Sequence, residues 1–290
     1  MARTRRIKKT ECGETYYHLM SRTNDRRFLF RKAVAKDALV DILRRTAEFS
    51  GIDLKAYTMM DNHFHIVCKV SRDETEIPES EILRRVAALK GVRFAENLRE
   101  HWGDLRKIGN LAAYEEALRH YRLRMNDISE FIKTFKETFN IWYKRFIAEE
   151  RHVAGTDPAD APYSGGIWEG RFKSTIIQDG EYLARCCRYV VLNPVRARIV
   201  GQVKDYRWSC CESEAVGVSS GGDDIETTEG GRLLKRIAQI GAGKIFGSRE
   251  YVMSVAFALG DRFRTKTVGA HQAGENGYST HGWRLAERAA

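Results

Sequence analysis

The fold of this chain is decided by the stretch Met59-Met60-Asp61-Asn62-His63-Phe64-His65-Ile66-Val67-Cys68-Lys69-Val70, residues 59–70. Because successive side chains of a strand point to opposite faces, His63 and His65 share one surface, and the apolar side chains between and after them share the other. This alternation predicts a strand with one buried face and one face that presents two imidazoles. A histidine pair of this kind also occurs in strands that bind no metal, so both interpretations stay open until further ligands are found.

The composition predicts a globular chain with an affinity for polyanions. Of the 290 residues 43% are hydrophobic, which is enough to bury a full core. The chain carries 49 Lys and Arg against 39 Asp and Glu, a net charge of +10, with a pI near 9.3. Such an excess favours phosphate-rich partners, but the charge alone does not distinguish DNA, RNA and membrane surfaces.

No apolar run approaches the ~18 residues of a membrane span, and no apolar segment follows the basic N-terminus. We therefore expect no membrane association and no signal peptide, and a cytoplasmic protein. The six cysteines include two adjacent pairs and no Cys-x-x-Cys spacing, which favours reduced structural thiols and leaves zinc binding as a minor alternative.

The order of predicted elements is strand, helix, strand, strand, helix, strand, helix. They lie at 16–23, 33–50, 52–59, 63–70, from about 127, 167–177, and from Asp179 to about 192. Gly51 suits a helix stop, Asp127 with Glu130 resembles a capping box, and Asp179 is the predicted N-cap of the last helix. This order predicts an α+β, ferredoxin-like fold with an antiparallel sheet and packed helices.

Changes of composition predict the domain organisation. The main domain should cover 1–212 and contain a polar helical insertion at about 71–124. A Gly/Ser/acidic linker at 213–231, a small helical module at 232–264 and a disordered tail at 265–290 should follow.

The last predicted helix of the main domain carries two further polar side chains. Tyr189 and Asn193 are four residues apart, so they share a face, and we expect that face to point away from the stripe of Leu183 and Val190. Asn193 could complete a cation site with the two histidines and leave Tyr189 within reach. An ordinary half-buried tyrosine and a helix-ending asparagine before Pro194 explain the same spacing.

Several ordered blocks then show a family resemblance. They are Tyr16-Tyr17-His18-Leu19-Met20-Ser21-Arg22, Met60-Asp61-Asn62-His63-Phe64-His65, Trp168-Glu169-Gly170-Arg171-Phe172-Lys173-Ser174, Tyr189-Val190-Val191-Leu192-Asn193-Pro194-Val195-Arg196-Ala197 and Tyr206-Arg207-Trp208-Ser209. With these blocks the chain resembles the IS200-like transposases with a single catalytic tyrosine, and more closely the REP-associated tyrosine transposases. The resemblance spans residues 14–212 approximately.

The resemblance implies a histidine-hydrophobic-histidine nuclease fold that cuts single-stranded DNA beside hairpins. It makes His63 and His65 metal ligands, Asn193 the third ligand, and Tyr189 the nucleophile that forms a 5′-phosphotyrosine. The cation would be Mg²⁺ or Mn²⁺. The predicted location is the cytoplasm, in association with the nucleoid, and the sequence allows a homodimer.

Basic side chains near these blocks are candidates for phosphate contacts, although each also fits a plain surface charge. They are Arg171, Lys173, Arg185, Arg188 and Arg196. Two other functions stay open: a catalytically silent, domesticated regulator that binds DNA hairpins, and a structural zinc protein that uses the cysteines.

Overall fold

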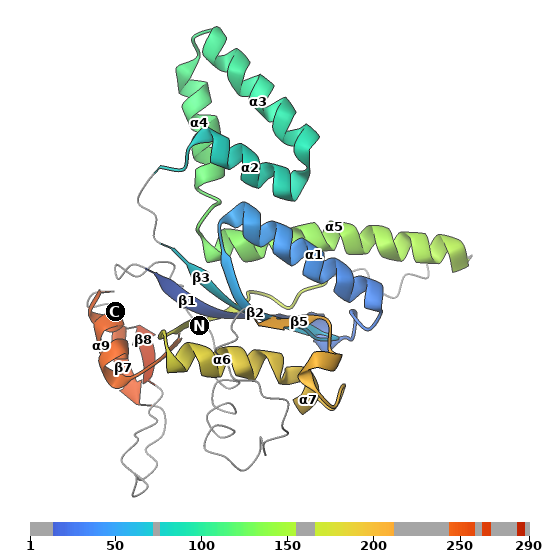
Figure 1. The fold of residues 1–290 in the computed structure, drawn as a ribbon, viewed down its shortest axis with the longest axis vertical. Coiled ribbons are helices and arrows are strands. Elements are labelled where there is room, and N and C mark those ends of the chain that lie inside the picture. Colours follow the sequence, from blue (N-terminus) through green and yellow to red (C-terminus); the bar gives the residue numbers. More distant parts are fainter. Residues whose placement is uncertain are drawn as a thin grey trace, which may run out of the picture. The chain divides into compact units, whose positions relative to one another are not determined.

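The structure, a computed structural model, describes residues 14–71, 76–154, 166–211, 244–258, 263–267 and 283–287. Figure 1 shows its elements, which form two compact units. The first unit contains the described parts of 1–21, 54–69 and 171–290, and the second those of 22–53 and 70–170.

The first unit is built around a sheet of six strands in the order β5-β2-β3-β1-β4-β6. Their bounds are β1 Thr15–Arg22, β2 Asp53–Met59, β3 His63–Val70, β4 Lys173–Ile177, β5 Ser209–Cys211 and β6 Lys244–Phe246. Strand β1 pairs antiparallel with β4, and β2 pairs antiparallel with β5. A three-residue turn joins the neighbours β2 and β3, which requires an antiparallel hairpin. The predicted antiparallel α+β fold is confirmed, and β6, parallel to β4, is its one exception among these described pairings.

Strand β3 shows the predicted alternation. Phe64, Ile66, Cys68 and Val70 are buried on one face, as the apolar row requires. On the other face Val67 is buried in a cluster with helix α6 (Glu181–Val191), and His63 and His65 share this face. The face that carries the two histidines therefore lies under a helix.

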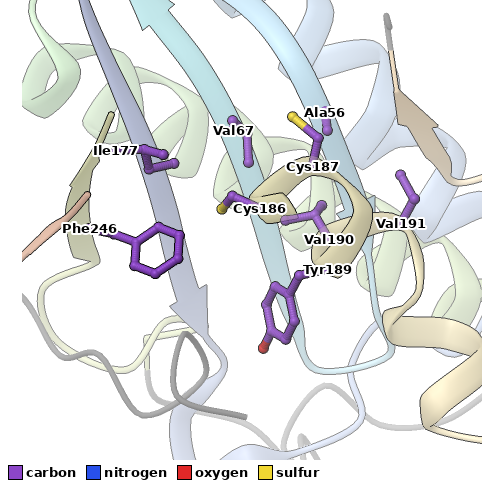
Figure 2. Packing of buried hydrophobic residues seen from close by; sticks show 9 residues of the cluster. All are labelled: Ala56, Val67, Ile177, Cys186, Cys187, Tyr189, Val190, Val191 and Phe246. Carbon is purple, nitrogen blue, oxygen red and sulfur yellow. The ribbon is translucent and has the colours of Figure 1, made fainter. Parts of the chain in front are cut away.

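Helix α6 packs on the sheet through an apolar cluster, drawn in Figure 2. The helix contributes Cys186, Cys187, Tyr189, Val190 and Val191, and the sheet contributes Ala56, Val67, Ile177 and Phe246. Residues from four strands of the sheet thus pack against α6. This packing holds Tyr189 against the sheet.

The second unit is helical. It contains α1 (Ala33–Ser50), α2 (Glu79–Lys90), α3 (Val92–Lys107), α4 (Leu111–Arg122) and α5 (Ile128–Ala154). Helix α1 ends at Gly51, which adopts the left-handed conformation at φ 63°, as the predicted stop requires. At the start of α5 the carboxylate of Asp127 accepts hydrogen bonds from the backbone N–H groups of Ser129 (2.6 Å) and Glu130 (3.0 Å). The Asp127 cap is thereby confirmed.

The predicted insertion forms helices α2, α3 and α4, which have a core of their own. Trp102 is fully buried between these helices, with Ile82, Leu83, Val86 and Leu89 of α2 around it. Phe49 at the end of α1 joins this cluster. The insertion is therefore a packed layer of the second unit, although most of its residues are polar.

Two predicted boundaries are wrong. Strand β4 begins at Lys173 instead of 167, because Gly170 bends the chain and Trp168 forms only an isolated bridge with Thr23. The N-cap of α6 is Gly180 instead of Asp179; the carboxylate of Asp179 accepts a bond from the N–H of Gly180, 2.7 Å away, and makes no cap to the helix. An aspartate before a glycine fits a helix N-cap as well as a residue of the preceding turn, so the sequence alone did not distinguish these two positions for Asp179.

The predicted helical module at 232–264 contains one helix in its described residues, and the C-terminal region also contains strands that were not predicted. Its described residues form β6, helix α9 (Arg249–Ala258) and two paired antiparallel strands, β7 (Phe263–Thr267) and β8 (Trp283–Glu287). A strand as short as β6 has too little alternation to be recognised without its partner. The predicted linker at 213–231 lies outside the described residues, and the predicted domain boundaries stay a prediction. None of the helices in the described ranges is long and apolar enough to cross a membrane.

Candidate active site

The two histidines lie at the start of β3, directly after the turn from β2. The backbone N–H of Met60 donates to the carbonyl of His63 over 2.8 Å and closes the turn. Asn62 supports the first ring, since its Oδ1 lies 2.7 Å from Nδ1 of His63. The rings of His63 and His65 are nearly perpendicular, with centroids 5.1 Å apart. The turn and the strand together therefore set the orientation of both imidazoles.

A third histidine, His18, reaches this pair from the neighbouring strand β1. Its Nε2 lies 2.9 Å from Nδ1 of His65, and the exposed fractions of the two side chains are 7% and 5%. Burial lowers the pKa of His18 to about 4, so its ring is neutral at neutral pH. A neutral imidazole has one donor nitrogen and one acceptor nitrogen, and the contact with His65 uses one of them.

No role for His18 was predicted from the sequence. The residue belongs to the block Tyr16–Arg22 that carries the family resemblance, and this was the one available signal. Its contact with His65 depends on β1 lying beside β3, an arrangement between segments 47 residues apart.

Helix α6 places Tyr189 against these rings. The phenol ring lies edge-on to His65, with centroids 5.6 Å apart and planes at 83°, and makes a similar contact with His18 at 6.0 Å and 81°. Figure 2 shows its hydroxyl directed away from the apolar members of the cluster. The sequence predicted that Tyr189 lies apart from the apolar stripe of Val190. This is wrong, because Tyr189 belongs to the same buried cluster as Val190 and only 3% of it is exposed.

Asn193 and Arg196 surround Tyr189 from the short helix α7 (Asn193–Arg196). The amide nitrogen of Asn193 donates to the carbonyls of Tyr189 (2.9 Å) and Val190 (3.2 Å). The guanidinium carbon of Arg196 lies 5.3 Å from the centroid of the Tyr189 ring. Burial raises the pKa of Tyr189, while the positive charge of Arg196 and hydrogen bonds from Asn193 and Arg196 oppose that rise.

The other predicted basic residues lie around the first unit in different settings. Arg185 is paired with Glu181 along α6, and Arg188 is half-buried on the same helix. Arg171 and Lys173 are exposed at the start of β4. Of the five predicted phosphate contacts, Arg196 is thus the one that the structure brings against Tyr189.

The chemistry of the donors fits a divalent cation. In both His63 and His65 the nitrogen Nδ1 is engaged, by Asn62 and His18 respectively, so Nε2 is the atom that would coordinate. The amide nitrogen of Asn193 is used by backbone carbonyls, so its Oδ1 is the atom that would coordinate. In the described part of the chain, no cluster of three or more His, Cys, Asp or Glu side chains suited to a metal occurs. The zinc alternative finds no support in those residues.

Fold and site together define an α+β protein whose antiparallel sheet carries a His-Phe-His strand beneath a tyrosine-bearing helix. Residues 12–112 match the family described as "Transposase IS200 like". The resemblance to the IS200-like transposases is confirmed by this match. The matched stretch contains His18, His63 and His65 and ends before Tyr189 and Asn193.

Several solved structures are similar to the chain, including the following two. One is described as a REP-associated tyrosine transposase bound to a REP hairpin; identity is 16%, the match covers 72% of this chain and 82% of that chain, and the TM-score is 0.40. The other is a putative transposase from Deinococcus radiodurans R1, with 28% identity, 35% of this chain and 70% of that chain covered, and a TM-score of 0.19. No curated protein matches the chain.

Proposed function

We propose that this protein is a metal-dependent endonuclease and strand transferase that acts on single-stranded DNA at hairpins, through a 5′-phosphotyrosine on Tyr189. The observation that carries the proposal is the contact between Tyr189 and His65, whose ring centroids lie 5.6 Å apart. A nucleophile must lie within reach of the group that activates the phosphate, and two elements distant in the sequence supply these groups at one place. The IS200-like match and the net charge of +10 support DNA as the partner.

In the proposed reaction the Oη of Tyr189 attacks the scissile phosphorus. A bond forms between Oη and phosphorus, the bond to the 3′ oxygen breaks, and that oxygen leaves as a 3′-hydroxyl after taking up a proton. Rejoining is the reverse step with another 3′-hydroxyl as the attacking group. The energy of the phosphodiester is conserved in the tyrosine ester, so strand transfer needs no nucleotide cofactor.

The phenol proton is the chemical obstacle, because burial makes the ionised form of Tyr189 less favourable. Arg196 counteracts this effect, since its charge and its hydrogen bond favour the phenolate. In this proposal Arg196 therefore assists the nucleophile as well as the binding of phosphate. Asn193 helps to hold Tyr189 in place through the carbonyl of that residue.

His63, His65 and Asn193 would hold the cation, Mg²⁺ or Mn²⁺. When bound, a divalent cation supplies Lewis-acid polarisation of the phosphate and offsets the charge that develops on its oxygens. The chain's own contribution is to hold the two imidazoles through the Asn62 and His18 contacts and to exclude water with the apolar cluster beneath α6.

The burial of Tyr189 favours the second candidate, a hairpin-binding regulator without cleavage. With 3% of its side chain exposed, the tyrosine reaches a DNA strand only if the surroundings of α6 open. A regulator that keeps the fold and binds DNA would not need this opening. The two candidates differ in one product, the covalent adduct.

The test is the formation of that adduct. The full chain is incubated with Mg²⁺ or Mn²⁺ and a 3′-labelled single strand that contains hairpin repeats from the DNA flanking the gene. A 3′ label is required because the tyrosine retains the 5′ phosphate of the downstream fragment. We expect a labelled band at the mass of protein plus DNA in a denaturing gel, lost in Tyr189→Phe and retained in Tyr182→Phe, a tyrosine of the same helix that packs against Phe246.

An adduct that persists in Tyr189→Phe would contradict the assignment of the nucleophile. If the chain instead binds the hairpin tightly in the presence of a chelator, and no adduct or 3′-hydroxyl product forms with either cation, the regulator is the correct reading.

A further inference from the structure

Beyond the proposed ligands and nucleophile, the structure contains a buried imidazole that neither role uses. His18 extends from β1 toward the same face as His65, and its ring plane is nearly parallel to that of His65, at 16° with a centroid distance of 5.1 Å. With 2.9 Å between Nε2 of His18 and Nδ1 of His65, the geometry is that of a direct hydrogen bond between two rings.

One proton must be shared between these two nitrogens. If Nδ1 of His65 is the donor, Nε2 of His65 carries a lone pair and can coordinate a cation. If Nε2 of His18 is the donor, Nδ1 of His65 accepts, so a neutral His65 carries its proton on Nε2 and cannot coordinate there. The direction of this single hydrogen bond therefore decides whether His65 is a ligand.

We propose that His18 is a positioning residue that accepts a hydrogen bond from Nδ1 of His65 and thereby holds His65 in the tautomer that presents Nε2 to a divalent cation. The inference rests on the proposed function, of which it specifies one part. Metal-bound histidines usually donate their other N–H to such an acceptor, and loss of the acceptor lowers metal affinity by about 10- to 100-fold.

The arrangement around His63 supports the same reading. Its Nδ1 faces Oδ1 of Asn62 at 2.7 Å. The amide oxygen of Asn62 thus has the same place beside His63 that His18 has beside His65. Both histidines of the pair thus have an acceptor on the same ring nitrogen. One acceptor comes from the adjacent residue, and the other comes from a neighbouring strand.

His18 also contacts Tyr189, so a loss of packing has to be separated from a loss of the acceptor. Gln and Met have nearly the same length and shape, and only Gln offers an oxygen to the N–H of His65. We expect His18→Gln to bind Mn²⁺ with an affinity close to that of the native chain and His18→Met to bind it about 10- to 100-fold more weakly, as measured by calorimetric titration of the metal-free protein. His101→Met, an exposed histidine of α3, should leave the affinity unchanged.

Equal Mn²⁺ affinities of the Gln and Met variants, whether both native-like or both weak, would overturn the role of His18. If either variant fails to fold, nitrogen-15 NMR of the native metal-free chain decides. A proton on Nδ1 of His65 supports the proposal, and a proton on Nε2 with Nδ1 as acceptor refutes it. Failure of the proposed function would give a different result: the native chain would bind no Mn²⁺, or His63→Ala would bind it as tightly as the native chain. The tautomer of His65 can be measured in either case.

Discussion

At the scale of single residues, Tyr189 is subject to opposing influences on its hydroxyl. Burial raises its pKa, and Arg196, which lies over its ring, favours the ionised form through charge and a hydrogen bond. Arg196 is exposed, so its charge is in part screened by water, whereas its hydrogen bond acts directly on the phenol. Arg196, together with the hydrogen bond from Asn193, therefore lowers the pKa of Tyr189 against the effect of burial.

Replacement of this arginine tests that dependence. Arg196→Gln removes a contribution that lowers the pKa of Tyr189, so the pKa rises further and the phenolate forms only at higher pH. We expect the rate of adduct formation at neutral pH to fall about tenfold, with a pH–rate profile displaced toward alkaline pH. Titration of the ring carbon of Tyr189 by NMR measures the same displacement without reference to activity. Arg198→Gln, an exposed arginine two residues later, is the control, and an unchanged titration of Tyr189 in Arg196→Gln would contradict the role of Arg196.

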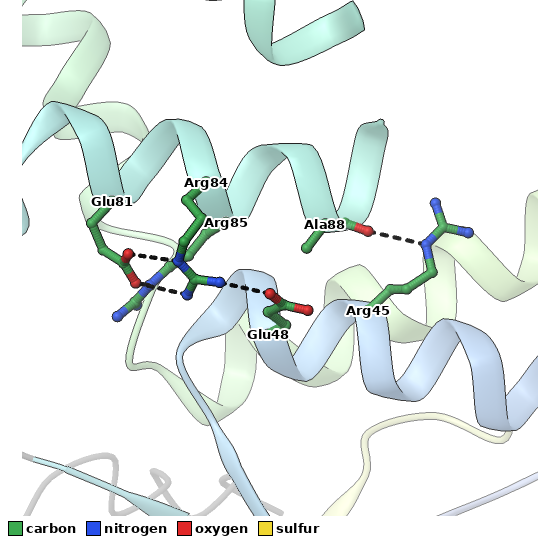
Figure 3. A network of polar contacts seen from close by, with 6 residues as sticks. All are labelled: Arg45, Glu48, Glu81, Arg84, Arg85 and Ala88. Atoms are coloured by element: carbon green, nitrogen blue, oxygen red, sulfur yellow. Dashed lines mark hydrogen bonds and ion pairs between the residues drawn. The ribbon is translucent and has the colours of Figure 1, made fainter. Parts of the chain in front are cut away.

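At the scale of elements, helices α1 and α2 of the second unit are joined by polar contacts, drawn in Figure 3. Arg45 of α1 donates to the carbonyls of Ala88 (3.1 Å) and Leu89 (2.6 Å) in the last turn of α2, where helical carbonyls lack partners. Arg84 of α2 bridges Glu81 of its own helix, at 2.7 Å, and Glu48 of α1, at 2.6 Å. These contacts tie the insertion to the helix that precedes it in the unit.

Glu81 gives this link a dependence on pH. Hydrogen bonds from Arg84 and Arg85 and their charges lower the pKa of Glu81 from its ordinary 4.5 to about 2, against the effect of desolvation. Because the pKa is depressed in the folded state, the stabilisation is present above pH 4.5 and is lost as the pH falls toward 2. Glu81 is half-exposed, so water screens part of this effect. Between pH 6 and pH 2.5 the free energy of unfolding, measured with urea, should fall further in the native chain than in Glu81→Gln, by up to about 1 kcal/mol. Glu100→Gln on α3 is the control, and equal losses in the native chain and Glu81→Gln would refute the link.

Some elements could be predicted from their own residues, whereas others depend on turns or on pairing with another segment. Helix α1 has an apolar stripe and a glycine stop, α5 has an aspartate cap, and β3 has an apolar residue at every second position from Phe64 to Val70, so each was recognised from its own residues. Strand β4 and the N-cap of α6 were displaced because turns at Gly170 and Gly180 decide them. Strand β6 was missed because three residues become a strand only through pairing with β4.

At the scale of the molecule, the candidate site draws on β1, on β3 and on α6 with the adjoining α7, all in the first unit and distant in the sequence. His63, His65, Tyr189 and Asn193 were named from spacing and family resemblance, since each has a recognisable neighbourhood in the sequence. His18 could not be given a role in this way, because its partner is determined by strand order. The burial of Tyr189 depends likewise on how α6 rests on four strands.

Strand β6 forms an edge of this sheet and comes from a segment far beyond α6 in the sequence, so α6 and β6 share one core. The ring of Phe246 meets Tyr182 of α6 edge-on at 5.0 Å, and its carbonyl accepts a hydrogen bond of 2.8 Å from the N–H of Gln178, in the turn between β4 and α6.

Phe246→Ala leaves a cavity at this junction and should lower the free energy of unfolding by about 3–5 kcal/mol. Hydrogen exchange at the amides of β4 should accelerate with it, because β4 loses the pairing that β6 provides. Met253→Ala, at an exposed position of α9, should change neither quantity by much. If the stability and the β4 exchange of Phe246→Ala remain native, β6 is not part of the sheet in solution, and α6 is held by the strands of residues 14–211 alone.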